Sequence, residues 1–176
     1  MNGKTFGNGT ITAAGVAILV IVRLLINTLD LDWELRIYPI LIVLIAAAYL
    51  GIREQRFNSS EELTYIMEWK AALRPTAVIA VIYSLFTFLF YKFIDPSFFA
   101  QLITRRKAEI QATIDKNDTP AEDAQMILEN FDQMSSMIFT PLNWATFTMM
   151  GTIIFSLIFS ALLVLLARQF PKVIIR

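Results

Sequence analysis

The chain has 176 residues, of which 56% are hydrophobic and only 17% are charged, so its composition is too apolar for an ordinary soluble domain of this length. Its 15 basic and 15 acidic side chains cancel, and a chain without a basic field is not expected to bind nucleic acid. It contains no cysteine and no histidine, which excludes thiolate nucleophiles, disulfides, zinc sites of the Cys/His kind and imidazole acid/base catalysis.

Four apolar stretches follow one another along the chain, at residues 11–29, 37–52, 74–94 and 143–167. A bilayer core of about 30 Å needs roughly 20 apolar helical residues, and backbone groups in hydrocarbon must be bonded within their own segment. The second stretch is short and is expected to span with help from Leu35, local bilayer thinning or snorkelling side chains. The fold predicted is therefore all-α, a polytopic membrane protein with four transmembrane helices.

The first apolar stretch has the position of a signal peptide but not its features. Only Lys4 precedes it, its apolar run is longer than the roughly 15 residues of a signal-peptide core, and Arg23 interrupts it. We expect it to remain as a membrane span.

The basic residues near the span ends indicate the orientation. Eight lie on the side that both termini share, against six opposite, and of those six only Arg36 and Lys92 are close to a span end. Because positive charge near span ends favours the cytoplasmic side, both termini are predicted to be cytoplasmic. The aromatic residues expected at the interfaces agree, with Trp33, Tyr38, Tyr91 and Trp144 at the outer one and Tyr65 and Trp69 at the inner one.

A capping box stands between the second and third spans. Ser59 and Glu62 have the spacing that satisfies the first free amides of a helix, so Ser59 is predicted to cap a helix that begins there. This helix either lies at the inner interface before Pro75 or simply extends the third span.

Residues 95–140 are too many for a structureless loop and predict an extracytoplasmic pair of amphipathic helices. Asp95 is expected to cap the first helix, Lys116-Asn117-Asp118 to form the turn, and Thr119 to cap the second helix. Apolar residues recur at helical spacing in both, namely Phe99, Leu102, Ile103, Ile110 and Ile114, then Ala124, Ile127, Leu128, Phe131, Met134 and Ile138.

Arg23 is the only charge inside a predicted span, and a charge in hydrocarbon suggests a function. Two interpretations stay open. In the first, its side chain snorkels to the headgroups or reaches Asp30, Asp32 or Asp95. In the second, it contacts an anion or a lipid headgroup.

Small residues repeat every four positions along two of the spans. Thr152, Ser156 and Ser160 do so beside Gly151 in the fourth span, and Ala13 and Ala17 do so in the first. They are expected to pack helices within the chain or, alternatively, against another copy or a partner. The third span also carries a cluster of aromatic residues, which is expected to face lipid. Its members are Tyr83, Phe86, Phe88, Phe90, Tyr91 and Phe93.

Acid pairs that could serve glycosidic or phosphoryl chemistry occur only in the predicted hairpin, where solvated helix ends ordinarily carry such residues: Asp115 with Asp118, and Glu122 with Asp123. The sequence thus predicts no catalytic residue, no cofactor-binding residue and no metal site.

The stretch Phe90-Tyr91-Lys92-Phe93-Ile94-Asp95-Pro96 closes the third span before the amphipathic hairpin. It resembles a family of small four-span membrane proteins of Bacteroidota grouped as a domain of unknown function. The resemblance implies a bacterial inner membrane with the hairpin in the periplasm, and a link to envelope glycan or lipid metabolism. It transfers no catalytic residue.

Three functions are compatible with these features. We expect a non-enzymatic accessory or assembly subunit of an inner-membrane complex, in contact with membrane lipid and with another membrane protein or copies of itself. The alternatives are a homo-oligomeric small transporter or channel and, third, an enzyme acting on membrane lipids.

Overall fold

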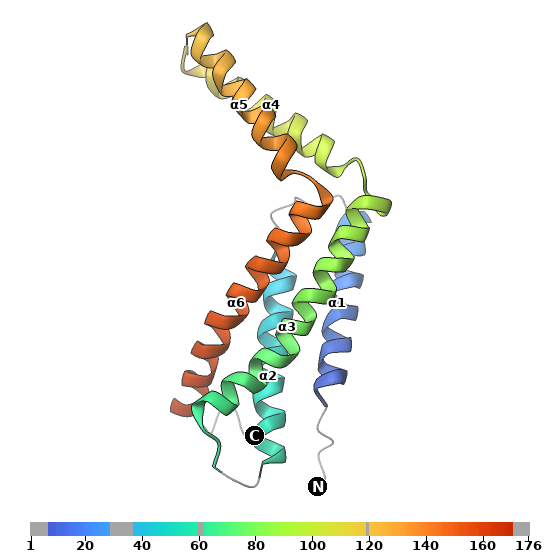
Figure 1. Ribbon diagram of the computed structural model, residues 1–176, viewed down its shortest axis with the longest axis vertical. Coiled ribbons are helices and arrows are strands. Elements are labelled where there is room, and N and C mark those ends of the chain that lie inside the picture. Colours follow the sequence, from blue (N-terminus) through green and yellow to red (C-terminus); the bar gives the residue numbers. More distant parts are fainter. Residues whose placement is uncertain (1–6, 29–36, 60–61, 119, 171–176) are drawn as a thin grey trace. The chain divides into compact units, whose positions relative to one another are not determined.

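The structure is a computed structural model that describes residues 7–28, 37–59, 62–118 and 120–170, and within these ranges it is entirely helical. The elements are α1 (Asn8–Thr28), α2 (Tyr38–Asn58), α3 (Tyr65–Leu89), the π-helical turn η2 (Phe90–Ile94), α4 (Phe98–Lys116), α5 (Ala121–Ile138) and α6 (Pro141–Gln169) (Figure 1). The predicted all-α class is confirmed for the described residues.

Within the part of the chain that the structure describes, three helical stretches are long and apolar enough to cross a membrane: Asn8–Asn27, Tyr65–Ile94 and Pro141–Gln169. In their most apolar windows only 22–39% of the residues are buried, so most of each helix surface is an uncovered apolar face. The second predicted span, residues 37–52, falls within α2 and is helical.

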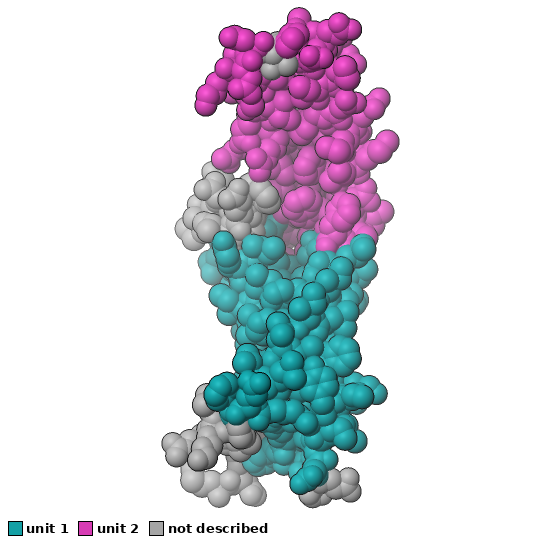
Figure 2. All heavy atoms as spheres, turned by 90° about the vertical axis from the view of Figure 1, so that its left-hand side faces the viewer, with its two compact units in different colours: residues 1–84, 148–176 teal, residues 85–147 magenta. Residues whose placement is uncertain are grey.

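The chain divides into two compact units (Figure 2). Unit 1 comprises residues 1–84 and 148–176, and unit 2 comprises residues 85–147. The boundary falls within α3 and within α6, so each of these helices contributes to both units.

The core of unit 1 brings together three helices through small and branched side chains. Ala48 and Ile52 of α2, Ala72 of α3 and Val164 of α6 are all at most 1% exposed and pack as one cluster. Small residues at such a contact let helix backbones approach closely, which is the usual basis of helix packing in membranes.

The helix α1 packs beside α2 through residues spaced by four. Its buried positions include Ile11, Gly15 and Leu19, and a Cβ atom at Gly15 would collide with the side chain of Ile79 in α3. Ala13 and Ala17 are both exposed, so their expected packing within the chain is wrong, and the buried positions lie two residues further along. Their packing against another copy or a partner stays a prediction.

The helix α3 is continuous from Tyr65 through Pro75, so the segment before Pro75 extends the helix and is not a separate element. The prediction that Ser59 caps this helix is also wrong. Ser59 ends α2, with an extended backbone and its N–H bonded to the carbonyl of Gln55. The first turn of α3 is instead closed by Thr64, whose hydroxyl accepts the N–H of Met67 at 3.4 Å.

The core of unit 2 is aromatic. Phe90 and Tyr91 of η2 are buried, and the Tyr91 ring lies 4.7 Å from the Phe98 ring and 4.8 Å from the Phe99 ring, measured between centroids. The prediction that the aromatic residues of this stretch face outward is therefore wrong for Phe90, Tyr91 and also Tyr83, although Phe93 is exposed. The π-helical turn changes which side of the helix each residue occupies, and regular helical spacing does not reveal this.

The helices α4 and α5 lie side by side (Figure 1). The apolar residues predicted to recur along one side of the first hairpin helix do so in α4, where Phe99, Leu102 and Ile114 are buried, so this α4 stripe is confirmed. The predicted turn is also present, and Asp118 adopts a positive φ of 47°, a conformation that Asp tolerates better than most residues. An exposed ion pair between Lys107 and Asp132 joins the two helices and adds at most about 1 kcal/mol of stability.

Candidate functional site

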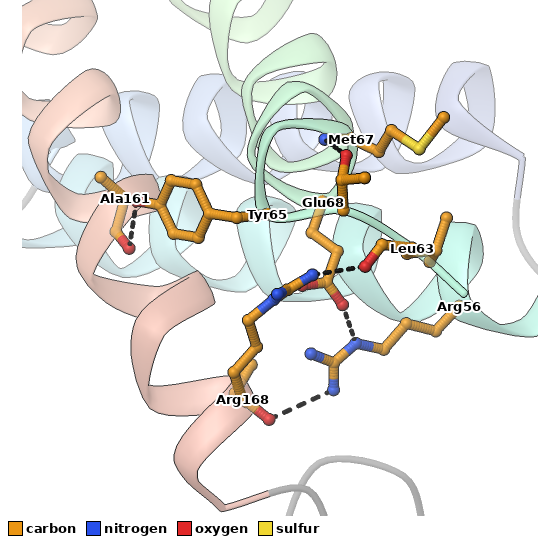
Figure 3. A network of polar contacts seen from close by, with 9 residues as sticks. Arg56, Leu63, Tyr65, Met67, Glu68, Ala161 and Arg168 are labelled. Carbon is orange, nitrogen blue, oxygen red and sulfur yellow. Dashed lines mark hydrogen bonds and ion pairs between the residues drawn. The ribbon is translucent and has the colours of Figure 1, made fainter.

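A charged cluster at one end of unit 1 is built from the ends of three helices. Glu68 lies in the first turn of α3, Arg56 in the last turn of α2 and Arg168 in the last turn of α6. Each charge therefore has the sign that favours its own helix dipole, negative at the start and positive at the end. Figure 3 shows both arginines pointing toward Glu68.

The Glu68 carboxylate accepts one hydrogen bond from each arginine. The Nε of Arg56 lies 2.5 Å from Oε1, and the Nε of Arg168 lies 2.6 Å from Oε2. The Glu68 side chain is only 4% exposed, whereas those of Arg56 and Arg168 are 15% and 39% exposed. The carboxylate is thus enclosed, and the Arg168 guanidinium connects the cluster with the surface.

Further hydrogen bonds from both arginines and from Tyr65 (Figure 3), and one from Trp69, hold the cluster in place. Arg56 also donates to the carbonyl of Ala167, and Arg168 to that of Leu63. Tyr65 and Trp69, one turn apart on α3, donate to backbone carbonyls of α6 at 3.2 and 3.3 Å. The start of α3 is therefore fixed against α6 on both sides of Glu68.

Among the described residues, two guanidinium groups face one carboxylate, so these three side chains together carry one positive charge in excess. A guanidinium has five N–H donors, and the contacts with described residues use two of them on each arginine. The arrangement has no nucleophile or proton donor poised for a reaction, but it retains donors that suit an oxyanion.

Sequence reasoning used Arg56 and Arg168 only to orient the chain and did not single out Glu68. The available signal was weak: an acid in a first turn and bases in two last turns are common surface features. Only the packing of α2, α3 and α6 shows that these three residues meet.

Arg23 lies on the protein-facing side of α1, with only 6% of its surface exposed. Asp30 and Asp32, two of its predicted partners, lie outside the described residues. Both interpretations of Arg23, the structural one and the anion or lipid-headgroup one, stay predictions.

The prediction that Asp95 caps α4 is wrong, because the helix begins at Phe98 and Ser97 occupies the cap position without a side-chain cap bond. Asp95 instead ends η2, where its N–H bonds to the carbonyl of Phe90 at 2.9 Å. Pro96 and Ser97 form a turn in which the N–H of Phe98 bonds to the carbonyl of Asp95 at 3.4 Å, so the helix begins two residues later than the capping pattern predicts. Thr119, the predicted cap of α5, lies outside the described residues.

The predicted packing residues of α6 divide into two groups. Thr152, Ser156 and Ser160 are buried in unit 1, which agrees with packing inside one chain. Gly151 is exposed, and a Cβ atom placed there would meet nothing within 4 Å, so its expected role in packing within the chain is wrong. It lies one residue, or about 100°, away from the buried stripe.

The described residues include no cluster of three or more acidic side chains able to hold a metal ion. The hollow at the α4–α5 turn, about 260 Å³, is lined mainly by apolar groups that include Ile110, Ile114 and Ile127.

The chain matches the family described as "Protein of unknown function (DUF4199)" over residues 8–169. It belongs to this family. The expected membership in a family of unknown function is thereby confirmed. No curated protein and no solved structure matches the chain.

Proposed function

We propose that this DUF4199 protein is an integral protein of the bacterial inner membrane, with four spans and cytoplasmic termini, and that it serves as an accessory or assembly subunit of a membrane complex. Its apolar helices support the membrane placement. Leu157, Ile158 and Leu162 of α6 are exposed, whereas the hydroxyl residues Ser156 and Ser160 of the same helix are buried. Apolar side chains outside and polar ones inside suit a helix that contacts lipid.

The proposal includes α2 as the fourth span. Its apolar part, residues 38–52, extends over about 23 Å at 1.5 Å per residue, so the proposed span relies on local bilayer thinning or on snorkelling of the charged residues that follow it. It packs beside α1 and contributes Ala48 and Ile52 to the core of unit 1. Charged residues begin only at Arg53, near the end of the helix.

One observation carries the accessory role, namely an uncovered apolar flank on α5. Ala124, Leu128 and Phe131 are partly buried on the side of α5 that α4 covers. Met126, Ile127, Met134 and Met137 form the neighbouring flank and are 43–71% exposed. The α5 stripe is therefore wider than the surface that α4 covers.

We infer that this α5 flank binds an apolar surface of another membrane protein. Three of its four apolar residues are methionines, whose flexible thioether side chains adapt to partner surfaces. The opposite flank carries polar residues, among them Gln125, Glu129 and Ser136, so only one side of the hairpin favours apolar contact. The homo-oligomeric transporter has less support, because Thr152, Ser156 and Ser160 lie inside a single chain and not on its surface.

The experiment is crosslinking in native membranes, purification of the tagged chain in mild detergent and mass spectrometry of the proteins recovered with it. The test variant carries Met134→Asp and Met137→Asp. The matched control carries Gln125→Asp and Ser136→Asp on the opposite flank. We expect a stoichiometric foreign protein with the wild type and the control but not with the test variant. Recovery of the chain alone, or equal recovery of the partner with all three, would refute the accessory role.

A further inference from the structure

We propose that the cluster of Arg56, Glu68 and Arg168 binds the phosphate group of an anionic phospholipid headgroup. The inference rests on the proposed membrane placement but not on the α5 flank. It concerns a different unit of the protein and a ligand of a different class.

The charge of the cluster supports an anionic ligand. Glu68 neutralises one of two guanidinium groups, and the charge in excess belongs to side chains that are only 15% and 39% exposed. Two partly buried cations that share one carboxylate among the described residues are not fully neutralised, and an arriving phosphate supplies a second negative charge. Guanidinium groups bind phosphate oxygens through paired N–H donors, and both arginines retain such donors beyond their contacts with described residues.

The neighbouring surface supports a lipid over a free phosphate ion. Leu165 and Leu166 precede Arg168 on α6 and are about half exposed, at 49% and 50%. Ile66 and Met67 precede Glu68 on α3 and are exposed to a similar extent. Exposed apolar side chains therefore lie within one helical turn of Arg168 along α6 and of Glu68 along α3, and a phospholipid needs apolar contacts for its acyl chain close to a guanidinium for its phosphate.

Arg105 lacks this arrangement. Arg105 of α4 has an exposed side chain that lies within 3.4 Å of Glu109, itself exposed. Such a pair exchanges freely with solvent ions and contributes little to binding. Arg105 is therefore a suitable control position.

The test uses the purified full chain in a neutral detergent. Binding of phosphatidylglycerol and of phosphatidylcholine is titrated by native mass spectrometry, with inorganic phosphate as competitor in a separate arm. The wild type is expected to prefer phosphatidylglycerol. Arg168→Gln is expected to weaken its binding about tenfold, the loss of one charge-assisted hydrogen bond, and Arg105→Gln to leave it unchanged.

The decisive comparison is with Glu68→Gln, which breaks the same ion pairs but leaves both arginines in place. A phosphate site predicts tighter binding of phosphatidylglycerol by this variant, the opposite of Arg168→Gln. A purely structural cluster predicts weaker binding by both, and that result would overturn the proposal. Should Glu68→Gln not fold, Arg168→Lys decides, because a lysine keeps the charge and must retain more binding than glutamine. Absence of headgroup preference in the wild type, or displacement of the lipid by millimolar phosphate, would also overturn it.

Discussion

The carbonyl oxygen of Ala71 in α3 occupies the space where a Cβ atom at Gly51 of α2 would lie. Pro75 accounts for the contact, because it has no N–H to bond the carbonyl four residues before it, which is that of Ala71. A carbonyl freed in this way faces the neighbouring helix, and only glycine leaves room for it. The Pro75 ring lies at the same point, with its Cγ atom 3.2 Å from the Cβ position.

Gly51→Ala is therefore expected to destabilise the protein by about 1–3 kcal/mol, the usual cost of overpacking a core. The measurement is the midpoint of thermal unfolding in detergent micelles. Gly151→Ala is the matched control, because Gly151 also lies inside a helix but has open space around its Cβ position. Alanine there is expected to raise stability by about 0.5–1 kcal/mol through helix propensity alone. Equal effects of both substitutions would contradict the close approach of α2 and α3.

Removing the carboxylate of Glu68 leaves two guanidinium groups facing each other at the ends of α2 and α6. Glu68→Ala is expected to cost about 3–5 kcal/mol, the typical penalty for breaking a buried ion pair on one side. The same unfolding assay measures it. Glu129→Ala is the control, because Glu129 is exposed and bonds only to Gln125 one turn away, so its loss should cost at most about 0.5 kcal/mol.

Two isoleucines of the α4–α5 pair distinguish its covered side from its open one. Ile114 is 7% exposed and Ile127 is 43% exposed. Ile114→Ala should cost about 2–4 kcal/mol, because it leaves a cavity between the helices, whereas Ile127→Ala should change stability by less than about 1 kcal/mol. Limited proteolysis of the hairpin checks the difference: faster cleavage of the Ile114 variant alone is expected. Equal protection of both variants would mean that α5 does not cover Ile114 in solution.

The absence of cysteine from the chain makes the proposed topology directly testable, since each introduced thiol is the only one present. Ser136→Cys in α5 and Asn58→Cys at the end of α2 are both at exposed positions. With four spans, a membrane-impermeant maleimide should label Ser136→Cys in intact cells, and Asn58→Cys only after lysis. If α2 did not cross the membrane, the two results would be reversed.

The sequence by itself determined the helices at the four apolar stretches, the α4–α5 turn and the α4 stripe, because apolar periodicity, proline and turn residues are local signals. Local signals were also why Ser59 and Asp95 were misassigned. Both satisfy a capping pattern, but a turn at Pro96 and Ser97 precedes α4, and the competing Thr64 caps α3. The membrane crossing of α2 and the orientation of the termini stay predictions.

Only the tertiary structure decided which side of each helix is covered. In an ordinary soluble helix hydrophobicity marks the buried side, but here both sides of α1, α3 and α6 are apolar, so the pattern does not distinguish them. For this reason the exposed Gly151, Ala13 and Ala17 could not be distinguished from residues that pack within the chain, and Tyr91 was placed outside. The meeting of Glu68 with Arg56 and Arg168, which are 12 and 100 residues away along the chain, has no local signal at all. It exists because three helix ends converge, and convergence is a property of packing.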